Sequence, residues 1–182
     1  RCDGYNRERG RGQFPLTAAG IGQLRGPDCA PEGRYVTALQ RTAQTARVVV
    51  AGAKRIPVDG LKEMNIGRFE GQTFVQVEQD PEYLAWVQEN EHAAHPDGER
   101  RSDFCNRVCK TLADLIDKAL AEGQERLVIV AHGGTQMAAL ERFGVPRRSF
   151  HDWCGPNAGG YVLDARDWPE QHILHLVETV QY

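Results

Sequence analysis

The chain has 182 residues, of which 41% are hydrophobic and 26% are charged, and its formal net charge is −3. This is ordinary globular composition, and we expect a single domain over residues 1–182. The small negative charge gives no reason to expect nucleic acid or an anionic membrane as the partner, and no apolar run approaches the roughly 20 residues that span a bilayer.

Short apolar segments alternate with segments of helical period along the first half of the chain. The elements predicted there, in chain order, are a strand at 34–37, a helix at 39–53, a strand at 56–58 and two helices at 70–78 and 81–90. The polar stretch at 90–101 is predicted to be an exposed loop. Its His92 and His95 lack a third well-spaced partner and are not expected to bind a metal ion.

A long helix is predicted to begin with Ser102 as its N-cap and to run to about Ala121, with Gly123 ending it. Its buried stripe is predicted to contain Phe104, Val108, Leu112, Leu115 and Ile116. The later elements are a strand at 127–131, a helix at 136–143 and a hairpin of strands at 161–164 and 172–178. This alternation predicts the α/β class, with a three-layer α/β/α sandwich around a mainly parallel central sheet.

The most informative segment reads LVIVAHGGT, at residues 127–135. A fully apolar run predicts a buried parallel strand, and it delivers His132 to the carboxyl end of the sheet. Ligands bind beyond the carboxyl ends of strands in open α/β sheets. Gly133 and Gly134 would let backbone N–H groups approach such a ligand, because no Cβ atom stands in the way. His132 is therefore a candidate site residue.

Two other segments contribute charged candidates. Arg41 lies in the first turn of the helix that follows the strand at 34–37, where a guanidinium fork and the helix N-terminus can both meet an anion. Glu63 lies in the loop LKEMNIGRFEG at 61–71, which is punctuated by two glycines and leads into a helix.

Motifs along the chain resemble the histidine phosphatase, or phosphoglycerate mutase-like, superfamily, and most closely its alpha-ribazole phosphatase and small-phosphatase branch. The matching residues, in chain order, are Pro15-Leu16-Thr17 with Gly20; Leu39, Arg41 and Gln44-Thr45-Ala46; Leu61, Glu63, Gly67, Glu70 and Gly71; Gly98-Glu99, Ser102, Phe104 and Arg107-Val108; Ala131-His132-Gly133-Gly134; and Asn157-Ala158. Val36, Thr37 and Ala38 stand where the family usually has Ser, Ser and Pro. Any one match is weak, but together, in the right order, they are specific.

The resemblance implies a phosphomonoester hydrolase that acts on a small phosphorylated metabolite through a phosphohistidine, without a metal or organic cofactor. Glu63 would donate a proton to the leaving group and later act as general base. Arg41 would clamp the phosphate, and His132 would stabilise the transferring phosphoryl group together with the backbone N–H of Gly133. Asn6 and Asn157 fall at further motif positions and are predicted to bind substrate.

One departure from the family is serious. The family's nucleophile is the histidine of an N-terminal strand ending in RHGxTxxN, whereas this sequence begins Arg1-Cys2-Asp3-Gly4-Tyr5-Asn6. Either RHG falls just before Arg1, or Cys2 stands where the histidine should be. We expect the first, because the strand would lie in the middle of the sheet and its loss would exceed a stability margin of roughly 5–15 kcal/mol. The alternatives are a non-catalytic phosphate-binding pseudo-phosphatase and a mutase-like phosphotransferase.

The five cysteines are odd in number and show no paired CxxC spacing. They therefore indicate neither a disulfide framework nor a zinc ribbon, and we expect a reducing, cytoplasmic location. The sequence leaves the oligomeric state open, a homodimer included.

Overall fold

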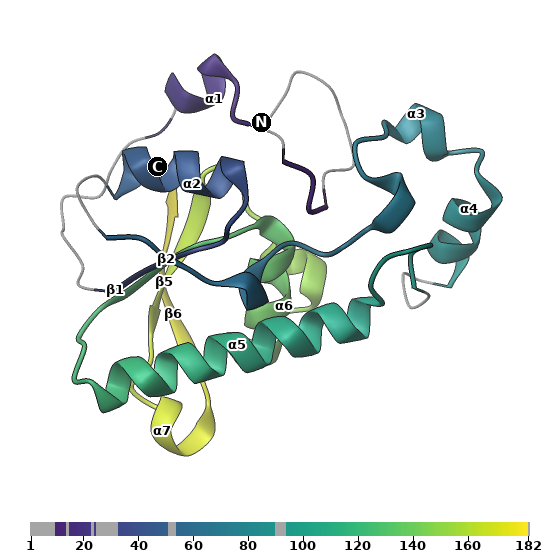
Figure 1. The fold of residues 1–182 in the computed structure, drawn as a ribbon. Coiled ribbons are helices and arrows are strands. Elements are labelled where there is room, and N and C mark those ends of the chain that lie inside the picture. The colour runs from purple at the N-terminus through teal and green to yellow at the C-terminus, as the bar shows by residue number, and fades with distance from the viewer. Residues whose placement is uncertain are drawn as a thin grey trace.

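A computed structural model of the chain describes residues 10–13, 15–22, 24, 33–50, 54–89 and 94–181 (Figure 1). The predictions for Cys2, Asn6 and His92 fall outside these residues. In the part of the chain that is described, no helix is long and apolar enough to cross a membrane.

The first sheet has three parallel strands, and the candidate site described below lies at their carboxyl ends. Strand β1 (Gly33–Val36) lies between β2 (Ile56–Pro57) and β3 (Leu127–Val130), with Val36 opposite both Pro57 and Val130. All three strands were predicted from their apolar runs. Because they are parallel, their carboxyl ends lie at the same end of the sheet. The α/β class is thus confirmed, with a mainly parallel sheet at its centre.

Helices cover both faces of this sheet. The side chains of β3 accordingly alternate between two hydrophobic cores, one on each face. Val128 and Val130 pack against the cluster that includes Val36 and helix α2 (Gln40–Val49). Leu127 and Ile129 pack against the larger cluster formed by the helices on the opposite face. Figure 1 shows α2 on one side of the strands and the long helix α5 (Arg101–Ala121) on the other. The short helix α1 (Ala18–Gly22) lies on the α2 side.

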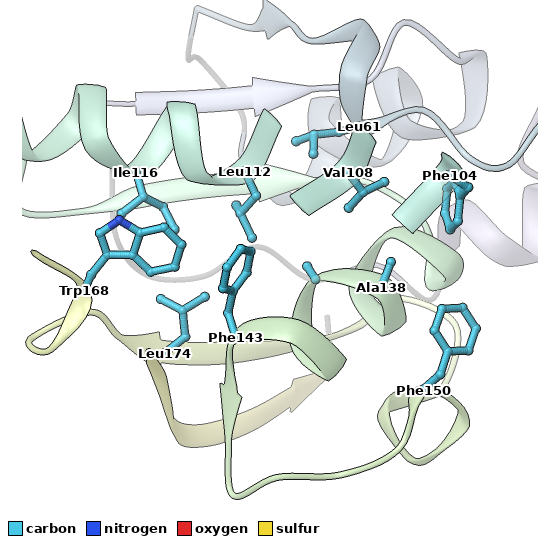
Figure 2. Close-up of a cluster of buried hydrophobic side chains, with 11 residues drawn as sticks. Leu61, Phe104, Val108, Leu112, Ile116, Ala138, Phe143, Phe150, Trp168 and Leu174 are labelled. Carbon is cyan, nitrogen blue, oxygen red and sulfur yellow. The ribbon is translucent and has the colours of Figure 1, made fainter. Parts of the chain in front are cut away.

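The larger core lies between α5, α6 (Gly133–Phe143) and the second sheet (Figure 2). Helix α5 turns Phe104, Val108, Leu112 and Ile116 into it, as predicted, and Gly123 ends the helix with a φ of 67°. Two details differ from the prediction. The N-cap is Arg100, so Ser102 lies inside the helix, and Leu115 is half-buried at the margin of the cluster.

The second sheet has the order β4–β6–β5 and comes from the C-terminal third of the chain. Strands β5 (Gly159–Asp164) and β6 (Leu174–Gln181) are antiparallel, and β4 (Gly144–Val145) runs parallel to β6. The predicted hairpin is correct as a strand pair. The strand at 172–178 begins later than expected, however, because helix α7 (Trp168–Gln171) intervenes and His172 takes a left-handed conformation at its end.

Between β2 and α5 the chain forms short helical elements apart from the sheets. These are η1 (Asp59–Leu61), η2 (Gly67–Phe69), α3 (Phe74–Val77) and α4 (Pro81–Gln88). A further short helix, η3 (Phe150–Trp153), follows β4. The helix predicted at 70–78 is wrong in extent, since only its second half is helical. Asp80 caps α4 and Pro81 occupies its first turn, which accounts for its correct prediction.

His95 contradicts the predicted exposed loop. It is 4% exposed, and its ring stacks on Trp86 with centroids 4.3 Å apart and meets the edge of Phe69. Burial lowers the pKa of His95 to about 4, so its imidazole is neutral and packs as an aromatic ring.

Candidate active site

His132 lies where the apolar strand β3 gives way to helix α6. Its backbone is extended and it serves as the N-cap of α6, so helix α6 begins at Gly133 rather than at the predicted Gln136. His132 is 6% exposed, and its Nε2 lies 2.7 Å from Oγ1 of the buried Thr37, which follows β1. Two neighbouring parallel strands thus bring His132 and Thr37 together.

The environment keeps the His132 ring neutral. Burial lowers its pKa most strongly, and the charges of Arg41 and Arg107 lower it further, to about 3. A ring in this state gains a proton at neutral pH only if a ligand brings negative charge beside it.

Glu63 reaches the same helix N-terminus from the loop between η1 and η2. Its Oε2 accepts a hydrogen bond from the backbone N–H of Gly134 at 3.2 Å, and its Oε1 accepts one from Met64 N–H at 3.0 Å. This approach depends on glycine, because a Cβ atom at Gly134 would lie 2.2 Å from Glu63 Oε1. A Cβ atom at Gly133 would meet nothing within 4 Å. The sequence singled out Gly133, and it did not indicate that Gly134 positions Glu63.

The pKa of Glu63 is raised above its ordinary value. Burial is the dominant cause, and it outweighs the backbone hydrogen bonds from Met64 and Gly134 and the charges of Arg41 and Arg107. A carboxyl group with a raised pKa holds its proton to higher pH, which is the property that a general acid requires.

Arg41 occupies the first turn of α2, as predicted, and is 8% exposed. Its guanidinium donates to the carbonyl groups of Gly10 at 2.7 Å and Gly12 at 2.9 Å. Because its charge lowers the pKa of both Glu63 and His132, the three residues share one electrostatic environment. The structure therefore brings the three predicted catalytic residues together.

The remaining predicted residues are less closely tied to this group. Gly133 begins α6, directly after His132. Asn157 is exposed in the turn before β5, and the side chain of Gln136 in α6 donates to the carbonyl oxygen of Gly159, the first residue of β5, at 3.2 Å. Asn6 lies outside the described residues.

A second group of charged side chains fixes the loop that carries Glu63. Arg107 of α5 donates two hydrogen bonds to the Glu99 carboxylate, at 2.9 and 3.0 Å, and others to the carbonyl groups of Gly60 and Lys62. Glu99 also accepts from Asn65 N–H, and Arg11 bridges Glu99 and the carbonyl group of Glu63. Sequence reasoning assigned these residues no role, although Glu99 and Arg107 belonged to one motif match.

Replacing Glu99 by Gln should destabilise the protein by about 2 kcal/mol at neutral pH, because two arginines would lose their charged partner. Burial alone would raise the pKa of Glu99, but its bonds with Arg107, Asn65 and Arg11 hold it below the ordinary value. This stabilisation is present above the ordinary pKa and is lost as the pH falls through the lower folded value. Urea unfolding from pH 7 to pH 3 should therefore show a smaller loss of stability in the variant.

The exposed pair of Lys110 and Asp114 provides the control, and Asp114→Asn should change the stability little at either pH. A Glu99→Gln protein as stable as the wild type at pH 7 would contradict the proposed importance of this group.

Comparisons with known proteins concern the sequence family and the fold of this chain. A family model described as the histidine phosphatase superfamily (branch 1) matches residues 4–176. The fold is similar to that of the alpha-ribazole phosphatase from Shigella flexneri, with 23% identity, a TM-score of 0.81 and coverage of 94% of this chain and 87% of that one. It is also similar to phosphoglycerate mutases from Thermus thermophilus (24% identity, TM-score 0.65, coverage 97% and 90%) and Bacillus anthracis (20%, 0.60, 76% and 72%). No curated protein matches the sequence.

Proposed function

Because this chain belongs to the histidine phosphatase superfamily, we propose that it is a phosphomonoester hydrolase that acts on a small phosphorylated metabolite through a phosphohistidine intermediate. One observation carries the proposal. The Glu63 carboxyl group, whose pKa is raised, is hydrogen-bonded to the first turn of the helix that His132 caps, and the charge of Arg41 acts on both residues.

In the first step, the nitrogen of a nucleophilic histidine forms a bond to phosphorus while the bond from phosphorus to the ester oxygen breaks. Protonated Glu63 gives its proton to the departing alkoxide. Arg41, His132 and the N–H of Gly133 stabilise the charge on the phosphoryl oxygens. In the second step, the Glu63 carboxylate takes a proton from water as the water oxygen bonds to phosphorus and the phosphorus–nitrogen bond breaks. The electron pair returns to the histidine nitrogen, phosphate leaves, and the histidine and protonated Glu63 are restored.

The nucleophile in this proposal is a histidine on a further strand that pairs with β3. Among the described residues, β3 pairs with β1 alone and β5 with β6 alone, so β3 and β5 each form an open edge of their sheet. Val128 and Val130 of β3 and Ala158 beside β5 pack against the same apolar cluster, so both edges border it. All four residues of β3 are only half-buried, although the strand is fully apolar. A strand added beside β3 would complete the burial of β3 and, if parallel to it, would end beside His132.

Two finer assignments complete the proposal. We favour a phosphatase over a mutase because the chain is compact around Glu63 and in its later loops. We also propose a cytoplasmic location, since Cys105, Cys109 and Cys154 are free thiols.

The proposal is tested with protein expressed from its complete reading frame and assayed with p-nitrophenyl phosphate without added metal. The expected result is turnover with formation of an acid-labile phosphohistidine, detected with a radiolabelled substrate. Absence of turnover in a protein that contains the RHG histidine would sink the phosphatase assignment. Phosphate binding without turnover would favour the pseudo-phosphatase instead.

A further inference from the structure

Two hydroxyl groups, those of Thr37 and Thr42, form a hydrogen-bonded relay that connects the His132 ring to the backbone at the end of β1. Thr37 Oγ1 lies 2.7 Å from His132 Nε2 and 2.7 Å from Thr42 Oγ1. Thr42 Oγ1 lies in turn 2.7 Å from Leu39 O and 3.0 Å from Thr37 O. Both threonines are almost completely buried, so water does not substitute for these partners.

The carbonyl oxygens of Leu39 and Thr37 determine the direction of each hydrogen bond in this relay. A carbonyl oxygen only accepts, so the single hydroxyl proton of Thr42 is committed to Leu39 O and Thr37 O. Thr42 Oγ1 can then only accept from Thr37, which uses the hydroxyl proton of Thr37. Thr37 Oγ1 is left with lone pairs alone for His132, and Nε2 must supply the proton of that contact.

We propose that Thr37 and Thr42 are positioning residues that hold His132 as the Nε2–H tautomer, so that Nδ1 is the nitrogen through which His132 meets a phosphoryl group. The relay has the same direction whether the ring is neutral or protonated, because Nε2 carries a proton in both states. His132 can therefore gain and lose a proton at Nδ1 without any rearrangement of Thr37 or Thr42.

The part of the proposal that concerns phosphoryl groups rests on the proposed function. In the free protein Nδ1 carries a lone pair, because burial and the charges of Arg41 and Arg107 lower the pKa of His132. A bound phosphoryl group reverses this balance, since its negative charge favours a proton at Nδ1. His132 would then donate to a phosphoryl oxygen through Nδ1 while Nε2 remains bonded to Thr37.

The tautomer can be measured directly by long-range 1H–15N NMR of the free, full-length protein at pH 7, with His132 assigned by a His132→Gln variant. The wild type should show a protonated Nε2 and an unprotonated Nδ1. In Thr42→Val, Thr37 loses its acceptor and can donate to Nε2, so the proton on His132 should move to Nδ1. Thr42→Ser, which keeps the hydroxyl group, should restore the wild-type signals.

A wild-type His132 that carries its proton at Nδ1 and none at Nε2 would overturn the proposal before either threonine is changed. Unchanged signals in a folded Thr42→Val protein would also overturn it, because a threonine that only fills space would not control the tautomer. Titration with inorganic phosphate is a separate measurement, and it should protonate Nδ1 in the wild type. If phosphate leaves His132 unmoved while the free protein shows the Nε2–H tautomer, the proposed function fails and the relay stands.

The corresponding pair of variants at Thr37 should differ in turnover of p-nitrophenyl phosphate. Loss of the relay in Thr37→Val should lower kcat by about tenfold. Thr37→Ser should recover most of that loss, and failure of the serine to do so would contradict a role for the hydroxyl group.

Discussion

Replacing Glu63 by Gln is expected to lower kcat for an alkyl phosphate by about 100- to 10,000-fold, because the amide cannot protonate the departing alkoxide. The amide oxygen can still accept from Gly134 N–H, whereas the amide nitrogen cannot accept from Met64 N–H as Oε1 does. The change thus removes the acidic proton and one hydrogen bond to the backbone, and the variant should still fold.

The choice of leaving group makes this prediction specific to acid catalysis. A nitrophenolate leaves readily without a proton, so the loss in Glu63→Gln should be much smaller with p-nitrophenyl phosphate in the first, phosphoryl-transfer step. Single-turnover measurements on both substrates would give this ratio. Equal losses on the two substrates would remove Glu63 from its role as the acid.

The pH profile supplies a second criterion. A general acid acts while it is protonated, so activity of the wild type should fall as the pH rises through the raised pKa of Glu63. Glu63→Gln should lose this fall. Glu122→Gln, which changes a carboxylate at the exposed end of α5, should retain both the rate and the profile.

The elements that carry the site were predictable because local patterns and tertiary packing agree there. The four apolar residues of β3 could only be accommodated between two covered faces, and the polar HGG that follows marks the end of the strand. Arg41 was likewise predictable, since a helix after a short strand fixes its first turn at the edge of the sheet.

Long-range contacts explain what the sequence did not reveal. Two glycines argue against a helix start, yet α6 begins at Gly133 because Glu63 accepts from Gly134 N–H and Thr135 Oγ1 donates to Leu61 O. Neither partner is adjacent in sequence. His95 was misplaced for a similar reason, since its loop is polar but the distant rings of Phe69 and Trp86 enclose it.

A second large loss of activity is expected from a change at Gly134, because this residue contacts Glu63. Gly134→Ala is expected to lower kcat by about 100-fold, since misplacement of a catalytic group by about 1 Å has a cost of this order. The new methyl group would occupy the position of the Glu63 carboxyl group, 2.2 Å from Oε1. A carboxyl group is the mobile end of its side chain, so it should move while the fold remains.

A double-mutant cycle decides whether Gly134 acts through Glu63. If it does, Gly134→Ala should cost little further activity in the Glu63→Gln background, because the group that it displaces is already inactive. Gly133→Ala is the matched comparison, because its methyl group enters open space and its effect should add independently to that of Glu63→Gln. Additive losses for Gly134→Ala would mean that this glycine serves the substrate or the helix directly. A strong coupling would establish that the absence of a side chain at Gly134 is what places the acid.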